Sequence, residues 1–338
     1  MIDLNTLWFL LVGGLFAGYA VLDGFDLGVG ALYLLVGEDE ERRLLLNSIG
    51  PVWDGNEVWL VVGGGALFAA FPRVYATVFS GFYLAMMLIL VALIFRGLAI
   101  EFRGQQPMRW WRQLWDVSFS AGSIGAALLM GIALGNLIRG IPIDAAGQYS
   151  AGLPDLLRPY PLLVGITTLA LFAMHGAIYL LLRVEGDLHE KVRRWVIWTI
   201  VAFVVCYVAT TIATMIEVPA MGERALSRPL FLGVPVVTVA AILNIPREVR
   251  RRRGWPAFLS SCVVVFGLMA LVGIGMYPNL ATALDPARSL TIYNAASTPA
   301  TLRRMALMAA IAGPFVALYT VSIYRVFSGK VKLDASSY

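Results

Sequence analysis

Stretches of about 20 residues without a charged side chain recur along the whole sequence, and this feature limits the folds that the chain can adopt. A helix needs about 20 apolar residues to cross the roughly 30 Å hydrocarbon layer of a bilayer. In that layer every backbone polar group must find its partner inside the structure, which a helix achieves on its own. The composition agrees, because only 14% of the 338 residues are charged and the mean hydropathy is +0.77. The sequence therefore predicts an all-α integral membrane protein.

The apolar pattern predicts nine transmembrane helices in one membrane-embedded unit that comprises residues 1–338. The predicted segments are 7–36, 51–71, 74–98, 115–138, 160–182, 195–217, 228–246, 256–277 and 302–325. The seventh segment is the weakest, because it is short and contains Pro229, Pro235 and Pro246. The first is too long and too rich in glycine for a cleaved signal peptide, so we expect it to remain in the mature protein.

Basic residues indicate the orientation, because Lys and Arg in short loops are retained on the cytoplasmic side of a membrane. Most of the 26 Lys and Arg residues fall on that side if the amino terminus is periplasmic and the carboxyl terminus is cytoplasmic. The run of arginines at 250–253 follows an apolar segment, which favours contact with anionic lipid over binding of nucleic acid. The basic balance therefore describes membrane topology, and we expect no nucleic-acid partner.

Four carboxylates lie inside the first two predicted helices. Asp23 and Asp26 in "DGFDLG" are three residues apart and share one helix face, and Asp54 and Glu57 in "GPVWDGNEVWL" have the same spacing. With the amino terminus outside, all four are expected at a similar depth in the cytoplasmic half of the membrane. A charged side chain at the centre of a membrane helix costs about 2.5–3.5 kcal/mol, so four such residues are expected to have a function.

Arg96, at the end of the third predicted helix, is expected to reach the same layer. One hypothesis is that the carboxylates form a proton-conducting entrance from the cytoplasm and that Arg96 tunes their proton affinity. The alternative is structural: Asp23 or Asp54 caps an interrupted helix, or Asp54 and Arg96 form a permanent ion pair that only joins two helices. The assignment of Glu57 to this site has an alternative, in which its side chain points toward lipid headgroups or toward a partner subunit.

Residues that could hold a redox centre are scarce. His175 could supply one haem ligand, but a lone histidine in a membrane is more often hydrogen-bonded to a neighbouring helix, and His189 is expected in a solvated loop. Trp53 is expected to anchor its helix at the membrane interface, with contact to a cofactor or quinone as the alternative. The sequence contains no CxxC, HExxH or P-loop motif, so we expect no metal site in this chain and expect any redox centre to lie in a partner.

Glycines spaced four residues apart predict where helices approach each other. Gly14 and Gly18, and then Gly24 and Gly28, each share one face of the first predicted helix. Small residues at this spacing let two backbones pack closely in lipid. Together with "GGG" at 63–65, they favour close packing of the first two helices.

Several long motifs resemble subunit II of the cytochrome bd-type quinol oxidases. These motifs are "DGFDLGVG", "ERRLLLNSIGPVWDGNEVWLVVGGGALFAAFPRVYATVFSGFY", "FRGLAIEFR" and, near the end, "GMYPNL" with "SLTIYNAAS". The resemblance covers almost the entire chain. The short length of the chain and the motif "MHGAIYL" are similar to those of the cyanide-insensitive branch of this family.

The resemblance implies a fold of two four-helix bundles with one extra helix, in a heterodimer with subunit I. In that family subunit I oxidises quinol and holds two b-type haems and one d-type haem, while subunit II ligates none. The resemblance also implies that Asp54, Asp23 and Asp26 match acidic positions of a proposed cytoplasmic proton pathway. Trp53 and Arg96 match family positions as well. Some relatives carry Gln in place of Glu57, which implies that a carboxylate is dispensable there.

We therefore expect a haem-free inner-membrane subunit that supports the reduction of dioxygen to water by quinol. In this hypothesis Asp54 and Asp26 relay cytoplasmic protons toward subunit I, Asp23 assists, and Arg96 tunes their affinity. Expected partners are subunit I, small accessory subunits, membrane lipid and quinone. The alternative is a proton-coupled secondary transporter, which requires inverted repeats with broken helices near the midplane of the membrane. A coloured complex with a haem-bearing chain would favour the oxidase, and a colourless lone chain that binds a solute would favour the transporter.

Overall fold

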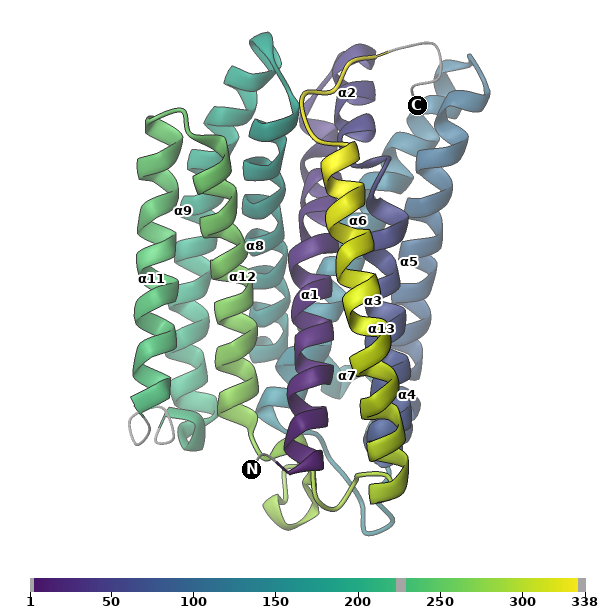
Figure 1. Ribbon diagram of the computed structural model, residues 1–338, viewed down its shortest axis with the longest axis vertical. Coiled ribbons are helices and arrows are strands. Elements are labelled where there is room, and N and C mark those ends of the chain that lie inside the picture. The colour runs from purple at the N-terminus through teal and green to yellow at the C-terminus, as the bar shows by residue number, and fades with distance from the viewer. Residues whose placement is uncertain (1–2, 223–228, 334–338) are drawn as a thin grey trace.

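The computed structural model describes residues 3–222 and 229–333, and most of them lie in long helices that run along one common direction (Figure 1). The long helices are α1 (Leu4–Leu32), α3 (Trp53–Ala70), α5 (Tyr83–Phe102), α6 (Arg109–Arg139), α8 (Pro159–Arg183), α9 (Gly186–Glu217), α11 (Pro229–Arg250), α12 (Gly254–Met276) and α13 (Pro299–Val326). Shorter elements are η1 (Tyr33–Leu35), α2 (Asp39–Ile49), α4 (Pro72–Gly81), η2 (Arg103–Gln105), α7 (Leu153–Leu156), η3 (Pro286–Arg288) and the antiparallel strands β1 (Asn279–Ala281) and β2 (Leu290–Thr291). The predicted all-α class is confirmed.

Seven of the described helical stretches are long and apolar enough to cross a membrane, so the chain is a multi-pass membrane protein. They are Leu4–Leu35, Tyr83–Gln105, Arg109–Arg139, Pro159–Arg183, Gly186–Glu217, Gly254–Met276 and Pro299–Val326. The predicted count of nine is not confirmed, because α3 and α11 are not among the seven. Helix α3 has only 18 residues and begins with a polar turn. Residue 228, the first of the seventh predicted segment, lies outside the described residues. Helix α11 continues through both Pro235 and Pro246.

The third predicted helix, 74–98, is two helices in the structure. Phe71 leaves the helical conformation before Pro72, which starts α4, as expected for a residue that precedes proline. Phe82, at φ −100° and ψ 22°, then separates α4 from α5. The break at Phe71 agrees with the predicted boundary between the second and third segments. The hydropathy pattern could not reveal the break at Phe82, because α4 and α5 are both apolar.

Several helices extend beyond their predicted ends. Helix α9 begins at Gly186, well before the predicted start at residue 195, and α6 begins at Arg109. The additional turns carry charged residues, which are tolerated where a helix leaves the hydrocarbon layer, so an apolar pattern does not detect them. The amphipathic α2 was not predicted. It has three acidic residues in its first turn, where the helix dipole favours negative charge, and it buries Leu45, Leu46 and Ile49.

Helix α1 lies at the centre of the molecule, in contact with α3, α6, α8, α12 and α13. The expected close packing of α1 on α3 occurs at Gly18, where an added Cβ would lie 2.6 Å from the indole of Trp59. The closest approach, however, is to α8. A Cβ on Gly28 would lie 1.8 Å from the carbonyl oxygen of Phe172, and one on Gly176 would lie 2.5 Å from the backbone of Gly28. The glycine spacing therefore predicted a packed face correctly, but the main partner of that face is α8.

Candidate functional site: a buried carboxylate and arginine cluster

A cluster of charged side chains joins α1, α3 and α5 inside the protein. Arg96 of α5 and Asp23 of α1 are fully buried. The guanidinium of Arg96 donates two hydrogen bonds to Asp23, from Nη2 to Oδ1 at 2.6 Å and from Nη1 to Oδ2 at 3.1 Å. Nη1 also donates to Oε1 of Glu57 on α3 at 2.7 Å. Such a two-pronged contact holds the guanidinium in one orientation and adds energy to the pair.

Small residues on α6 allow Arg96 to be buried so deeply. A Cβ on Gly122 of α6 would lie 2.5 Å from the carbonyl oxygen of Ala92 and 3.2 Å from Cβ of Arg96. The absence of a side chain at Gly122 thus lets α6 lie directly against α5. The stem of Arg96 is enclosed, and its charged end is directed toward α1 and α3.

Asp26, one turn after Asp23 on α1, belongs to the same cluster but is bound differently. Its Oδ2 accepts a hydrogen bond from Nδ2 of Asn56 at 2.7 Å and lies 4.0 Å from Nη2 of Arg96. Its Oδ1 is buried and has no hydrogen-bond partner among the described residues. Asn56 is oriented by its amide oxygen, which accepts a hydrogen bond from the hydroxyl of Tyr324 on α13 at 2.9 Å. The cluster therefore extends from α5 through α1 and α3 to α13.

Asp54 lies outside this cluster, on the exposed side of α3. It makes no hydrogen bond or ion pair with the described residues, so the expectation that all four carboxylates share one site is wrong. Helix geometry explains the difference: Asn56, which faces α1, is two positions away and therefore about 200° around the helix from Asp54. Glu57 lies about 100° from Asn56 and still reaches Arg96. Its side chain is 23% exposed, which makes it the one partly exposed carboxylate around Arg96.

The structural alternatives for these residues are also corrected. Arg96 pairs with Asp23 and Glu57, and not with Asp54. Asp23 lies within the continuous helix α1, so it does not cap an interrupted helix. Asp54 is in the first turn of α3, where the N-cap residue is Val52 and no side chain caps the helix. Neither aspartate has the capping role.

Trp53 lies at the junction of α3 and α5. Its half-buried indole covers Gly97, because a Cβ on that glycine would lie 3.2 Å from Cη2 of the ring. Gly97 follows Arg96 directly in the sequence, so the indole lies beside the charged cluster. The contact of Trp53 with a cofactor or quinone stays a prediction.

A second buried cluster was not predicted. Asp116 of α6 accepts hydrogen bonds from the hydroxyl of Tyr33 at 2.5 Å, from Nε of Arg103 at 2.5 Å and from Nη1 of Arg42 at 2.6 Å. Arg103 continues to Asp39 of α2, from Nη2 to Oδ1 at 2.7 Å. The cluster joins α2 and the ends of three other helices. The sequence feature that could have indicated this cluster is Asp116 at the start of the predicted segment 115–138, together with Arg42 and Arg103 between the predicted segments.

Both histidines make hydrogen bonds within the protein. Nε2 of His175 lies 2.9 Å from the carbonyl oxygen of Val21 and Nδ1 lies 2.8 Å from Oγ of Ser261. A carbonyl oxygen can only accept, so Nε2 carries the proton, and the expected bond to neighbouring helices is confirmed. The expectation of a solvated loop for His189 is wrong, because it lies half-buried in the first turn of α9 with Nδ1 3.3 Å from the carbonyl oxygen of Val184.

Comparison with known proteins identifies close relatives along the whole chain. A family model described as cytochrome bd terminal oxidase subunit II matches residues 4–327. The chain is 35% identical to cytochrome bd-I ubiquinol oxidase subunit 2 of Escherichia coli (strain K12), with 98% of this chain and 97% of the relative covered. It is 34% identical to cytochrome bd ubiquinol oxidase subunit 2 of Bacillus subtilis (strain 168), with 98% of each covered.

A solved structure shares the fold. The structure of bd oxidase from Geobacillus thermodenitrificans includes a chain that matches with a TM-score of 0.80, covering 96% of this protein and 99% of that chain. The sequence identity to that chain is 18%, so this match supports the fold alone.

Proposed function

This chain belongs to the family of cytochrome bd terminal oxidase subunit II and is a subunit of a quinol oxidase, and from that premise we propose that it supplies cytoplasmic protons for the reduction of dioxygen to water. The observation that carries the proposal is the arrangement around Arg96, where three buried or half-buried carboxylates surround one guanidinium. Full ionisation of that group would leave excess negative charge in a low-dielectric interior, which is costly. A cluster of this kind retains and exchanges protons.

Asp26 and Asp54 have complementary positions for such a relay. Asp26 is fully buried and has a carboxylate oxygen with no partner among the described residues, so it has a free position for a proton. Asp54 is exposed on α3, three residues before Glu57. Glu57 has exposed atoms and also contacts Arg96, so the buried cluster communicates with the protein surface at this residue. We assign Asp23 and Arg96 to setting the charge of the cluster, and Asp26 and Asp54 to carrying the proton.

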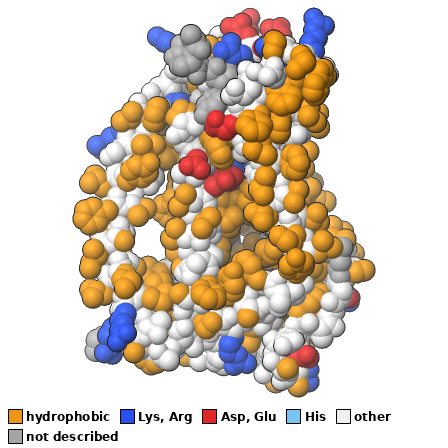
Figure 2. Space-filling model, turned by 90° about the vertical axis from the view of Figure 1, so that its right-hand side faces the viewer, with side chains coloured by type: hydrophobic (Ala, Val, Ile, Leu, Met, Phe, Trp, Pro, Cys, Tyr) orange, Lys and Arg blue, Asp and Glu red, His pale blue; other side chains and the backbone are white. Residues whose placement is uncertain are grey.

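The surface that carries Asp54 is suited to a membrane-embedded partner. Figure 2 shows acidic side chains amid hydrophobic ones on the face at the right of Figure 1, where α3, α4, α5 and α13 lie. Helix α13 exposes large apolar side chains along its length, including Ile311 and Phe315, which are 60% and 70% exposed. Subunit I of the oxidase is the partner that we place on this face. Asp54 would then lie at the subunit interface and not in lipid.

Nine membrane crossings fit the helix arrangement. Helices α1, α3, α5 and α6 form one set of neighbours, and α8, α9, α11 and α12 form another, with α13 as an additional helix against α1 and α3. The start of α1 and the end of α13 lie at opposite ends of the molecule, as an odd number of crossings requires (Figure 1). We orient the start of α1 toward the periplasm, because the basic residues then favour the cytoplasmic side.

The two b-type haems and the d-type haem are assigned to subunit I. His175 uses both ring nitrogens in hydrogen bonds between helices. Among residues 3–222 and 229–333, no group of three or more His, Cys, Asp or Glu side chains is arranged to hold a metal ion. The match to the oxidase family spans nearly the whole chain. We therefore favour the oxidase subunit over the transporter hypothesis.

The test is Asp54→Asn in the purified two-subunit oxidase, with quinol-dependent oxygen consumption and haem absorption measured on the same sample. We expect turnover to fall about ten-fold or more, in line with the loss of a group that transfers protons, while the haem spectrum stays unchanged. Asp187→Asn is the matched control, because Asp187 is an exposed acid in the first turn of α9, away from the Arg96 cluster. Normal turnover with intact haems would remove Asp54 from the pathway, and loss of haem would indicate a structural role.

A further inference from the structure

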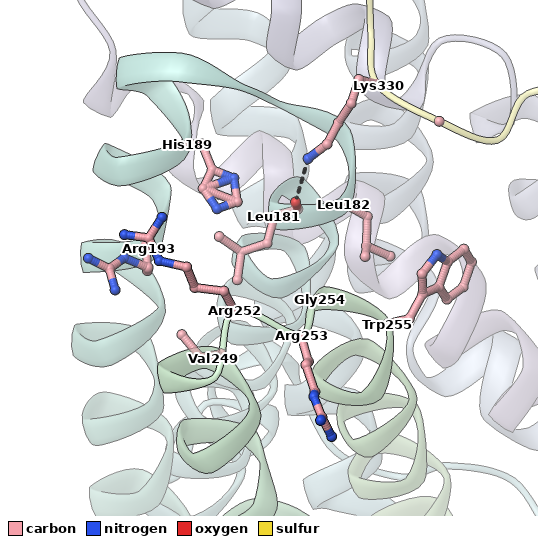
Figure 3. A pocket seen from close by; sticks show the side chains of 11 residues that line it. Leu181, Leu182, His189, Arg193, Val249, Arg252, Arg253, Gly254, Trp255 and Lys330 are labelled. Carbon is pink, nitrogen blue, oxygen red and sulfur yellow. Dashed lines mark hydrogen bonds between the residues drawn. The ribbon is translucent and has the colours of Figure 1, made fainter.

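A pocket of about 340 Å³ lies where α8 ends and α9 begins (Figure 3). Four segments meet there: the end of α8, the first turns of α9, the turn between α11 and α12, and the residues that follow α13. The lining contains Arg193, Arg252, Arg253 and Lys330 together with His189, and no acidic side chain is among its described lining residues. Its volume is within the roughly 300–1,000 Å³ of small-molecule sites.

The cations of this pocket are only partly neutralised by the protein. Arg193 and Arg252 share one carboxylate, that of Glu190, at 2.8 Å and 3.5 Å. The side chain of Arg253 is exposed and makes no ion pair or hydrogen bond with the described residues. Lys330 donates to the carbonyl oxygens of Leu181 and Val184 at 3.0 and 2.8 Å, which leaves one N–H of its ammonium group available. Burial lowers the pKa of Lys330, so a bound anion would favour its charged form.

The backbone at Arg252 provides an independent observation. The amide of Arg253 bonds to the carbonyl oxygen of Glu248 and that of Arg252 to Val249, which is the hydrogen-bond pattern that commonly ends a helix with glycine. Arg252 occupies the glycine position with φ at +56°, and it is the one non-glycine residue with positive φ in the described part of the chain. A long side chain is strained in this left-handed conformation. A strained residue that persists is a reason to look for a function, and Figure 3 shows the Arg252 side chain directed toward Arg193.

Apolar surface continues from the pocket along the helices. Trp255 lines the pocket and is 59% exposed, and Leu259, one turn further along α12, is 58% exposed. Trp198 of α9, just over one turn after Arg193, is 74% exposed. Tryptophan at this position is typical of the interface between headgroups and hydrocarbon. The ligand that fits is therefore an anion with an apolar tail.

We propose that this pocket binds the phosphate of an anionic membrane phospholipid, with the acyl chains lying along α9 and α12. The guanidinium groups of Arg193 and Arg252 and the ammonium group of Lys330 match phosphate oxygens, whereas Figure 3 shows the Arg253 side chain directed away from them. Basic pockets between membrane helices suit anionic headgroups. A zwitterionic headgroup fits less well, because its ammonium group would enter a pocket that is already cationic. In the orientation proposed above, the site belongs to the cytoplasmic leaflet.

The experiment uses the purified two-subunit oxidase, delipidated in detergent and titrated with phosphatidylglycerol, phosphatidylethanolamine or inorganic phosphate. Bound lipid is counted by native mass spectrometry, and thermal unfolding is followed on the same samples. The test variant is Arg252→Gly, which removes the charge and also relieves the backbone strain, so the delipidated variant should be at least as stable as the wild type. The control is Arg303→Gln, because Arg303 is exposed near the start of α13, at the other end of the molecule.

We expect the wild type to bind phosphatidylglycerol in preference to phosphatidylethanolamine. Arg252→Gly should weaken phosphatidylglycerol binding about five-fold, the loss expected for one basic residue at a membrane surface, and Arg303→Gln should leave it unchanged. Equal binding of the two lipids, or full binding to Arg252→Gly, would overturn the proposal. An equal loss in Arg303→Gln would show non-specific attraction. Stabilisation by millimolar inorganic phosphate that matches that by phosphatidylglycerol would assign the pocket to a soluble phosphate compound.

Discussion

Replacing Asp23 by asparagine tests how the buried charge of Arg96 is compensated. The substitution keeps the shape of the side chain, so it leaves no cavity and changes only charge and one hydrogen bond. Asparagine can still accept one bond from Arg96 through its amide oxygen, but its NH₂ group would face the second guanidinium nitrogen. Arg96 is fully buried and cannot move into water.

The expected cost follows from the partners that remain. Removing one partner of a buried ion pair usually costs about 3–5 kcal/mol, because a buried charge loses its counter-ion. Glu57 remains at 2.7 Å from Nη1 and Asp26 at 4.0 Å from Nη2, and asparagine retains one hydrogen bond. These contacts reduce the expected loss of stability to about 2–3 kcal/mol. For a chain of this size each kcal/mol lowers the melting temperature by roughly 2 °C, so we expect a decrease of about 5 °C.

The measurement is thermal unfolding of the two-subunit oxidase at one fixed scan rate, because unfolding of such a complex is irreversible. Asp155→Asn serves as control, since Asp155 forms an exposed pair with Arg158 and its loss should not change the melting temperature measurably. The double variant Asp23→Asn with Arg96→Gln removes both charges and should be more stable than the sum of the two single effects. Additive effects, or a shift below about 1 °C for Asp23→Asn, would refute the view that Asp23 is the main counter-ion of Arg96.

Three further predictions concern other parts of the structure. Gly28→Ala should destabilise the subunit by at least about 1–3 kcal/mol, because its Cβ would overlap the α8 backbone, whereas Gly64→Ala meets open space and should have no such effect in the same unfolding assay. The pKa of Asp39 is held below its usual value: burial opposes ionisation, but hydrogen bonding and charge from neighbouring arginines outweigh it. The contribution of the Asp39 carboxylate to stability is therefore present above about pH 4 and is lost as the pH falls through the lowered pKa. The melting temperatures of wild type and Asp39→Asn should converge at low pH. Parallel pH profiles of the two proteins would contradict this. Glu57→Gln keeps an oxygen that accepts from Arg96, so oxygen consumption should fall less than in Asp54→Asn; an equal or greater loss would show that the Glu57 carboxylate itself carries protons.

The composition of the charged site was predictable in part. Asp23, Asp26, Glu57 and Arg96 were expected to share one layer because their spacing and the depth of each segment could be read from the sequence, and the structure brings these four together. Asp54 was expected with them and lies outside. The difference is a helix rotation: depth along a helix follows from residue counting, but the direction of a side chain depends on which face of α3 packs against α1. Nothing in the sequence of α3 separates the Asn56 face from the Asp54 face strongly enough to decide this.

The sequence by itself determined the membrane class, the helical architecture and the positions of the acidic motifs, because hydrophobic thickness and backbone satisfaction impose strong local rules on each segment. It also indicated that one face of α1 packs closely, through glycines four residues apart. Only the tertiary structure decided that this face crosses α8 at Gly28 and Gly176, and that Asp116 gathers Tyr33, Arg42 and Arg103. Pairings of this kind join residues far apart in the chain, and they depend on the rotation and crossing angle of whole helices, which local sequence patterns do not specify.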